Sequence, residues 1–324
     1  MEKVVFRSIT PVFRFGVGER PFVYEGRLGE ARYRIELAKI EAGPAGFAYL
    51  MENVPEEVHD RLISIHLAKH TATDVFLIID VFYPPPYDRF FKQSGSNELG
   101  QIERAIFDAL RLHTTFGFTY YKTYEVNMFH EQTPLWLSSP LTKPYLFSHF
   151  GHQKSMLIEQ NHQAVVNTFH QLLEHKWDND KYTFDRVMQL AMSYHRTLSK
   201  LENVEHAFLL LMVILQALFT SKDEEFSSAI GRIKWLNINR REERGKLNPI
   251  WENVRDLRND IAHGDPNYSI QVVKEKYPQV YQQVSKAIIR LWAIKDEIRE
   301  GDYYDNLKKH IDGKERELKR GGEG

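Results

Sequence analysis

The sequence predicts an α+β protein in which an N-terminal strand-rich domain is followed by a C-terminal all-α helical bundle. Apolar and polar residues alternate over residues 32–37, a pattern typical of a strand with one face in water. Residues 75–83 are almost continuously apolar, as expected for a buried central strand. In the second half, residues 204–219 are apolar nearly all round, which indicates a helix at the centre of a bundle.

The chain is long enough for two domains. It has 324 residues, and a domain commonly has about 150. We expect a strand-rich α+β domain with a sensing or binding role at residues 1–150, and a connecting helix within residues 151–181. A helical domain follows at residues 182–300, and the charged tail at residues 301–324 is expected to fray.

The composition excludes several classes of protein. The chain contains no cysteine, so disulfides, thiolate nucleophiles and cysteine zinc sites are excluded. The formal net charge is −1, so attraction to RNA or DNA requires a local basic patch. Residues 1–10 lack the apolar core of a signal peptide, and the longest strongly apolar run, residues 207–215, is too short to cross a bilayer. We therefore expect a cytoplasmic protein without a membrane segment.

Residues 250–263 predict an amphipathic helix, which carries the main candidate site. Its apolar residues recur at steps of four, three and four, so they form one stripe facing the core; they are Ile250, Val254, Leu257 and Ile261. Gly264 and Pro266 form a stop signal, which places His263 in the last turn. There the negative end of the helix dipole favours an imidazolium, which suits a proton donor near neutral pH.

A polar stripe on the same helix contains the candidate catalytic residues. Arg255, Asn259 and His263 are spaced by four, so they lie roughly opposite the apolar stripe. Arg258 lies between the stripes, about 140° from His263 on a straight helix, so only its long stem lets it approach the imidazole. The structural alternative is a helix end capped by His-Gly, with an arginine paired to a carboxylate at a subunit contact.

A basic segment precedes this helix. Residues 239–246 read NRREERGK, and we predict a flexible loop there. Its candidate phosphate contacts are Arg240, Arg241, Arg244 and Lys246. A solvated charged loop is the alternative explanation.

A further helix is predicted over residues 277–298, where apolar residues follow a heptad-like spacing. Pro278 is expected in its first turn. Such a seam either packs inside the bundle or forms a dimer surface.

Five histidines crowd the region between the two halves: His149, His152, His162, His170 and His175. The segment has no His-Glu-x-x-His or His-x-Glu spacing, so we interpret these residues as surface or interface histidines. We expect neither a metal site nor a cofactor.

With these helices in place, residues 182–298 resemble a HEPN domain of the Apea-like group. The resemblance rests on the Arg-x4-His motif from Arg258 to His263, on Asn259 directly after the arginine, and on the Gly264 that closes the helix. Upstream, LLLMVILQALF at residues 209–219 is similar to the central helix of the family, with Gln216 where the family has Glu.

The resemblance implies a metal-independent endoribonuclease that acts as a homodimer and needs no cofactor. Both protomers would contribute their motifs to one cleft, cut single-stranded or tRNA-like RNA and leave 2′,3′-cyclic phosphate ends. His263 would move a proton, Arg258 would neutralise charge on the phosphoryl oxygens, and Asn259 would hold the phosphate or the imidazole. Arg255 is a second candidate phosphate contact.

The resemblance also implies a role in antiphage defence, in which a trigger or regulator acts on the N-terminal domain. Some HEPN domains serve only as binding or dimerisation modules. The alternative function is therefore a non-catalytic HEPN-type dimerisation or RNA/protein-binding module.

Overall fold

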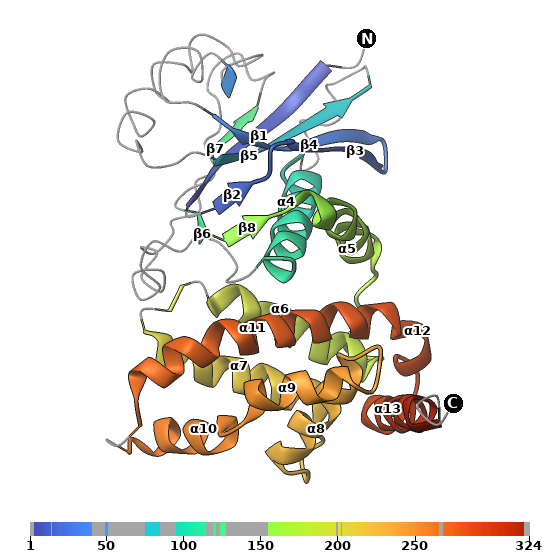
Figure 1. Cartoon of the computed structure of the whole chain (residues 1–324). Helices are drawn as coiled ribbons and strands as arrows, with labels where there is room; N and C mark the ends of the chain where they lie inside the picture. Colours follow the sequence, from blue (N-terminus) through green and yellow to red (C-terminus); the bar gives the residue numbers. More distant parts are fainter. Residues whose placement is uncertain are drawn as a thin grey trace. The chain divides into compact units, whose positions relative to one another are not determined.

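The computed structural model of the chain describes residues 3–13, 15–40, 49–50, 75–84, 95–114, 119–120, 124–127, 155–198, 200–201, 203–265 and 268–320. The chain divides into two compact units. The first contains an antiparallel sheet and the second is helical (Figure 1). The predicted α+β class is confirmed.

The first unit is built on a sheet with the strand order β3–β4–β5–β1–β6, in which β7 also pairs with β1. The strands are β1 (Lys3–Phe13), β3 (Phe22–Leu28), β4 (Ala31–Lys39), β5 (Val75–Tyr83), β6 (Thr119–Tyr120) and β7 (Tyr124–Asn127). β5 lies between β4 and β1, and all its residues except Phe82 are buried. It is therefore the central strand that its apolar sequence predicts. Buried and half-buried residues alternate over the first half of β4, as its sequence also predicts.

Two helices, α4 (Gly95–Leu112) and α5 (His162–Glu174), lie on one face of this sheet (Figure 1). The Phe169 ring of α5 packs 5.7 Å from the Tyr33 ring of β4 and 6.1 Å from the Tyr24 ring of β3, measured between ring centroids. Because of this packing, α5 belongs to the first unit through Leu173, although the sequence predicts a connector there.

The connecting helix is shorter than the sequence predicts, because the segment before α5 is not α-helical. A short strand, β8 (Ser155–Leu157), pairs in parallel with β2 (Phe15–Val17). A 3-10 turn, η3 (Glu159–Asn161), then leads into the helix at His162.

The second unit consists of helices packed around α7. They are α6 (Thr183–Leu198), α7 (Val204–Phe219), α8 (Phe226–Leu236), α9 (Glu243–Trp251), α10 (Val254–His263), α11 (Ile270–Ala293), α12 (Lys295–Ile298) and α13 (Tyr303–Arg320). α7 contacts α6, α8, α10 and α11, and most of its residues are buried. The predicted central helix is confirmed.

The expectation that residues 301–324 fray is wrong for most of the segment. Residues 303–320 form α13, whose Tyr303, Leu307 and Ile311 are buried. These residues recur at steps of four, which places them on one helix face. Tyr303 also donates a hydrogen bond of 2.7 Å to the Leu218 carbonyl of α7. The many charges conceal this short apolar stripe in the sequence.

The start of α11 also differs from the prediction. The helix begins at Ile270, so Pro278 lies inside it rather than in its first turn. Val273 and Tyr277 are fully buried in the turns before the proline. Their burial compensates for the backbone hydrogen bond that proline cannot donate.

Among the helices that the structure describes, none has both the length and the apolar character needed to cross a membrane.

Candidate functional site

The predicted site helix is interrupted, so its apolar stripe belongs to two helices. α9 ends at Trp251 and α10 begins at Val254. Between them Asn253 has φ 59° and ψ 5°, a left-handed conformation that asparagine adopts more readily than most residues. The prediction of one helix from Ile250 is therefore wrong. Val254 and Leu257 are buried residues of α10, as their spacing predicts, and α10 packs against α7.

The end of α10 is fixed by Gly264. Its φ of 70° and ψ of 30° are left-handed. The Gly264 amide donates 3.2 Å to the Ile261 carbonyl, and the Asp265 amide donates 2.8 Å to the Asp260 carbonyl. This pair of bonds is the Schellman arrangement, which satisfies the last carbonyls of a helix. It ends α10 directly after His263 and leaves His263 exposed; Pro266 lies outside the described residues.

The Arg258 guanidinium is held by two contacts within its own chain. Its Nη1 donates a hydrogen bond of 2.9 Å to Oδ1 of Asn259. Its Cζ lies 5.6 Å from the ring centroid of Phe226, the first residue of α8. The bond to Asn259 draws the guanidinium toward the polar stripe, because Asn259 lies one turn before His263. No hydrogen bond joins Arg258 to His263 in the part of the chain that the structure describes.

The polar stripe itself faces outward, as its spacing predicts. Arg255 and His263 are exposed, whereas Arg258 and Asn259 are half-buried. The structure thus brings Arg258 and Asn259 into contact and leaves the imidazole of His263 open to a ligand or to another protein.

The predicted basic loop is partly helical. Arg240 and Arg241 are exposed in the turn between α8 and α9, whereas Arg244 and Lys246 are exposed within α9. Oε2 of Glu243, the first residue of α9, accepts a hydrogen bond of 2.8 Å from the Asn239 amide, which joins the preceding turn to the helix. The Arg244 Cζ lies 4.4 Å from the ring centroid of Trp235 in α8. Arg244 is therefore anchored and not part of a flexible loop.

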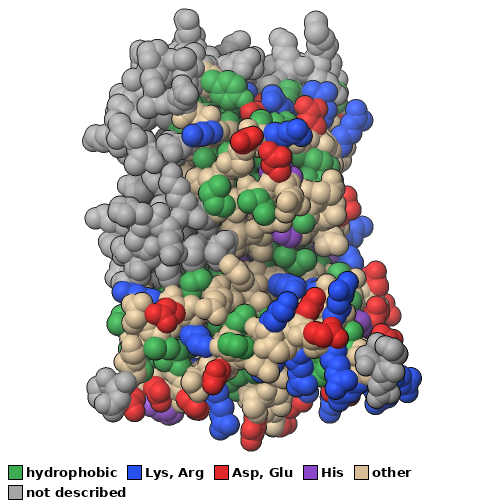
Figure 2. Space-filling model, in the orientation of Figure 1, with side chains coloured by type: hydrophobic (Ala, Val, Ile, Leu, Met, Phe, Trp, Pro, Cys, Tyr) green, Lys and Arg blue, Asp and Glu red, His purple; other side chains and the backbone are tan. Residues whose placement is uncertain are grey.

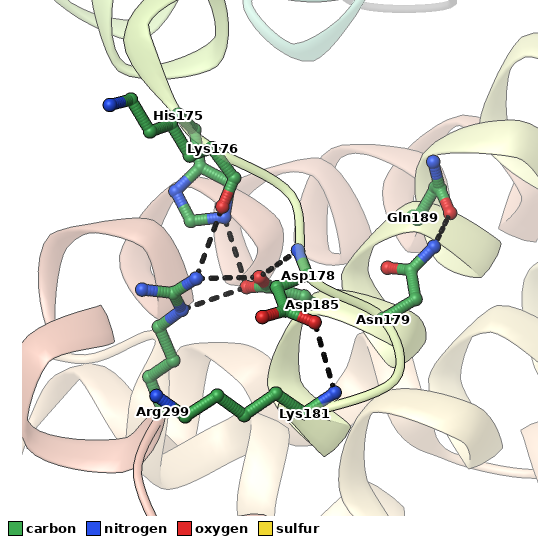
Figure 3. Close-up of polar contacts among 8 residues, drawn as sticks. All are labelled: His175, Lys176, Asp178, Asn179, Lys181, Asp185, Gln189 and Arg299. Atoms are coloured by element: carbon green, nitrogen blue, oxygen red, sulfur yellow. Dashed lines mark hydrogen bonds and ion pairs between the residues drawn. The ribbon is translucent and has the colours of Figure 1, made fainter.

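A buried polar network that the sequence analysis missed surrounds Asp185 of α6 (Figure 3). Nε2 of His175 lies 2.9 Å from Oδ1 of Asp185. Arg299 donates from Nε to Oδ1 at 3.0 Å and from Nη2 to Oδ2 at 2.7 Å. The Asp178 amide donates 2.8 Å to Oδ2. His175 and Asp178 lie near Asp185 in the sequence, but Arg299 is 114 residues away, so no local motif reveals the network.

The network changes the pKa values of its members. Burial raises the pKa of Asp185, but the hydrogen bonds from Arg299, from the Asp178 amide and from His175 together lower it below its ordinary value. Burial, followed by the charges of Arg299 and Lys295, lowers the pKa of His175 below its ordinary value, although the hydrogen bond and the charge of Asp185 raise it. A neutral His175 and an ionised Asp185 are therefore favoured, and every oxygen of the buried carboxylate is satisfied. These features indicate a structural role.

Two of the other predicted surface or interface histidines contact aromatic residues of β3. His162 packs edge-on against Phe22, with ring centroids 5.3 Å apart. Nε2 of His170 forms a hydrogen bond with the Tyr24 hydroxyl of β3. His149 and His152 lie outside the described residues. The interpretation as a surface or interface histidine is wrong for His175, because its side chain is only 4% exposed within its own chain.

Within the described ranges, His, Asp and Glu side chains do not form a group of three or more that could hold a metal ion.

Comparison of the chain with protein-family models, with curated proteins and with solved structures gives no match.

Proposed function

We propose that this chain is a metal-independent endoribonuclease of HEPN type that acts as a homodimer in the cytoplasm. Arg258, Asn259 and His263 of both protomers would form one composite site. One observation carries the proposal: Asn259 holds the Arg258 guanidinium on the stripe that ends at an exposed His263. A cation and a proton-transfer group on one outward face suit the cleavage of a phosphodiester.

The proposed reaction uses the RNA strand as its own nucleophile. The ribose 2′-oxygen forms a bond to the adjacent phosphorus, and the bond from phosphorus to the 5′-oxygen of the next nucleotide breaks. One His263 would accept the 2′-hydroxyl proton, and the His263 of the other protomer would donate a proton to the departing 5′-oxygen. The products are a 2′,3′-cyclic phosphate and a 5′-hydroxyl end. Arg258 would neutralise the charge that grows on the phosphoryl oxygens.

Two further roles complete the proposal. Arg255, exposed on the same stripe, would contact a phosphate next to the one that reacts. The strand-rich unit would sense a trigger, because an unregulated cytosolic ribonuclease is toxic to its own cell. An antiphage role then predicts that cells tolerate expression until phage infection. Unconditional toxicity, or tolerance without any effect on phage, would contradict that role.

The second candidate is a non-catalytic dimerisation or RNA/protein-binding module. It is favoured by the contacts of Arg258, which already binds Asn259 and the Phe226 ring within its own chain. Gln216 on α7 also stands where the resembled family has a carboxylate. Under this function, replacement of Arg258 would weaken association or folding instead of catalysis.

Cleavage of labelled single-stranded RNA in the presence of EDTA tests the enzyme. We expect the wild-type protein to leave 2′,3′-cyclic phosphate ends and His263→Ala to leave the RNA intact. The matched control is His310→Ala on α13, where the imidazole pairs with Glu297 at 2.8 Å. The control is expected to cut like the wild type.

Dimer mass, measured by light scattering, separates the two candidates. The enzyme requires His263→Ala to remain a dimer while losing cleavage. Equal cleavage by wild type and His263→Ala would overturn the proposed site. Absence of cleavage in both proteins, together with a smaller mass for Arg258→Ala, would favour the binding module.

A further inference from the structure

Four helices of the second unit bring six basic side chains close to one another, and two of these side chains pack on the Trp235 ring. We call this group of side chains the Trp235 basic cluster. Its members are Lys234 on α8, Arg244 on α9, Lys286 and Arg290 on α11, and Lys314 and Lys319 on α13. On the face shown in Figure 2, Lys and Arg side chains gather over α9 and the end of α13. Since the members are spread over residues 234–319, only folding assembles the cluster.

The Trp235 ring anchors two of these cations. The Arg244 Cζ lies 4.4 Å and the Lys319 Nζ 5.9 Å from the ring centroid. Both distances are within the range of a cation–π interaction. The ring is itself only 5% exposed, so it supports the cations from below and presents little apolar surface.

Arg290 and Lys314 are held by neutral oxygens. Lys314 Nζ donates a hydrogen bond of 2.8 Å to the Leu236 carbonyl, to which Arg290 also donates. Arg290 reaches Oδ1 of Asn239 at 2.7 Å through Nη2. In the described part of the chain, the hydrogen-bond partners of these two cations are carbonyl and amide oxygens, and none is a carboxylate.

Acidic groups compensate the cluster only in part. Glu315 pairs with Lys319 at 2.6 Å. Glu243 also lies near, but one of its oxygens accepts the Asn239 amide at 2.8 Å. Burial, together with the nearby charges of Arg290 and Lys286, lowers the pKa of Lys314 to about 8, although Glu243 opposes this change. The pKa of Lys286 is lowered by burial and then by Arg290. An excess of positive charge therefore remains.

We propose that the Trp235 basic cluster binds the phosphate backbone of single-stranded RNA. The inference rests on the proposed ribonuclease function and adds the place where the substrate strand is held. Phosphate contacts need fixed cations and little apolar area, which this surface provides. A protein partner would instead favour an exposed aromatic or apolar centre, and the aromatic ring of this cluster is buried.

The cluster lies away from the proposed cleavage site. In Figure 1, α13 and α10 lie at opposite ends of the second unit. α9 and α10 have 9 and 10 residues, so at about 1.5 Å per residue they span at most roughly 30 Å. Exposed Arg240, Arg241 and Lys246 extend the positive surface beside α9. A strand on this surface would be positioned for cleavage without any base contact, so the cluster binds many sequences equally.

Binding in the His263→Ala background tests the inference independently of cleavage. The probe is a fluorescein-labelled single-stranded oligoribonucleotide, and the measurement is fluorescence anisotropy over a range of salt concentrations. The test variant combines Arg244→Gln, Lys286→Gln and Lys319→Gln, which are exposed residues of the cluster. The control combines Lys222→Gln, Lys274→Gln and Lys308→Gln, which removes the same charge from the same unit. Lys274 and Lys308 precede Lys286 and Lys319 by about three helical turns.

We expect the test variant to bind RNA roughly tenfold or more weakly than the control, with a salt dependence shallower by about 2, since each phosphate contact contributes about 0.7 to the slope. Equal binding by the test and control variants would overturn the proposal that the cluster binds RNA, without contradicting the proposed ribonuclease activity. Cleavage by the wild type is assayed alongside. Failure to bind and failure to cut would overturn both proposals. Equal competition by duplex DNA would show a general polyanion surface and overturn the assignment to single-stranded RNA.

Discussion

Arg299 binds both carboxylate oxygens of Asp185, at 3.0 Å from Nε and 2.7 Å from Nη2, across 114 residues of sequence. The Asp185 side chain has no exposed surface, and that of Arg299 is 24% exposed. Two parallel hydrogen bonds from a guanidinium are among the stronger polar contacts in proteins. They tie α6 to the chain after α12, and the Asp178 amide adds the segment before α6. One buried carboxylate therefore joins three segments of the second unit.

Replacing that carboxylate by an amide should destabilise the protein. Asp185→Asn removes the charge but keeps the shape, so Arg299 loses its ionic partner in a buried site. We expect the free energy of unfolding to fall by about 3 kcal/mol, measured by urea denaturation. Asp178→Asn is the matched control, because Asp178 is exposed and its Oδ1 accepts a hydrogen bond of 3.0 Å from the backbone amide of Lys181. Equal unfolding midpoints in the two variants would refute the structural role of Asp185.

The same network predicts a loss of stability in mild acid. Burial holds the pKa of folded His175 below the ordinary 6.5, so the unfolded chain binds the proton first as the pH falls. The free energy of unfolding should therefore decrease from about pH 6.5 downward, by up to about 1.4 kcal/mol per pH unit, until the pH reaches the lower pKa of folded His175. Below the ordinary 3.8 of Asp185 a second loss begins, because its folded pKa is also lowered.

His175→Gln isolates the contribution of this imidazole. The variant should show a shallower decrease between about pH 6.5 and 5 than the wild type, because it has one group fewer to titrate. His195, whose pKa burial lowers to about 3, contributes equally to both proteins. Urea midpoints across this interval provide the measurement. Parallel curves would mean that His175 titrates alike in the folded and unfolded chain.

Two glycines allow a test of the helix stop after His263. Gly264 and Gly231 both have open space where a Cβ would stand, but only Gly264 has a positive φ, of 70°. Gly264→Ala should therefore lower the free energy of unfolding by about 1 kcal/mol. Gly231→Ala, inside α8, should raise it by roughly 0.5–1 kcal/mol. Thermal melts of both variants check these opposite signs. If both variants were more stable than the wild type, the left-handed helix stop would be excluded.

The packing of α13 is testable with neighbouring residues. Leu307 is fully buried and Lys308 is exposed. Leu307→Ala should cost about 3 kcal/mol of unfolding free energy, through lost burial and the cavity left behind. Lys308→Ala should change it by less than about 0.5 kcal/mol. A frayed tail would make the two substitutions equally harmless, and chemical denaturation distinguishes the outcomes.

Local patterns predict the elements around the candidate site well, and they fail where backbone conformation or charge conceals the pattern. The outward stripe of Arg255, Asn259 and His263 follows from a spacing of four, since that spacing fixes a helix face. The break at Asn253 does not follow, because asparagine adopts both right-handed and left-handed conformations and the residue type does not decide between them. Contact between Arg258 and Asn259 depends on side-chain rotamers, which spacing cannot give.

The sequence by itself determined the α+β class, the central strand β5, the central helix α7 and the end of α10 at His263. Each of these depends on hydrophobic period or on one glycine, and both are local properties. Only the tertiary structure decided that α13 packs by Leu307 and that Arg299 meets Asp185. It also brought Lys319 to the Trp235 ring and Lys286 close to Arg290 and Glu243. These contacts join residues far apart in the chain, so they form only when burial of the apolar faces fixes where each helix lies.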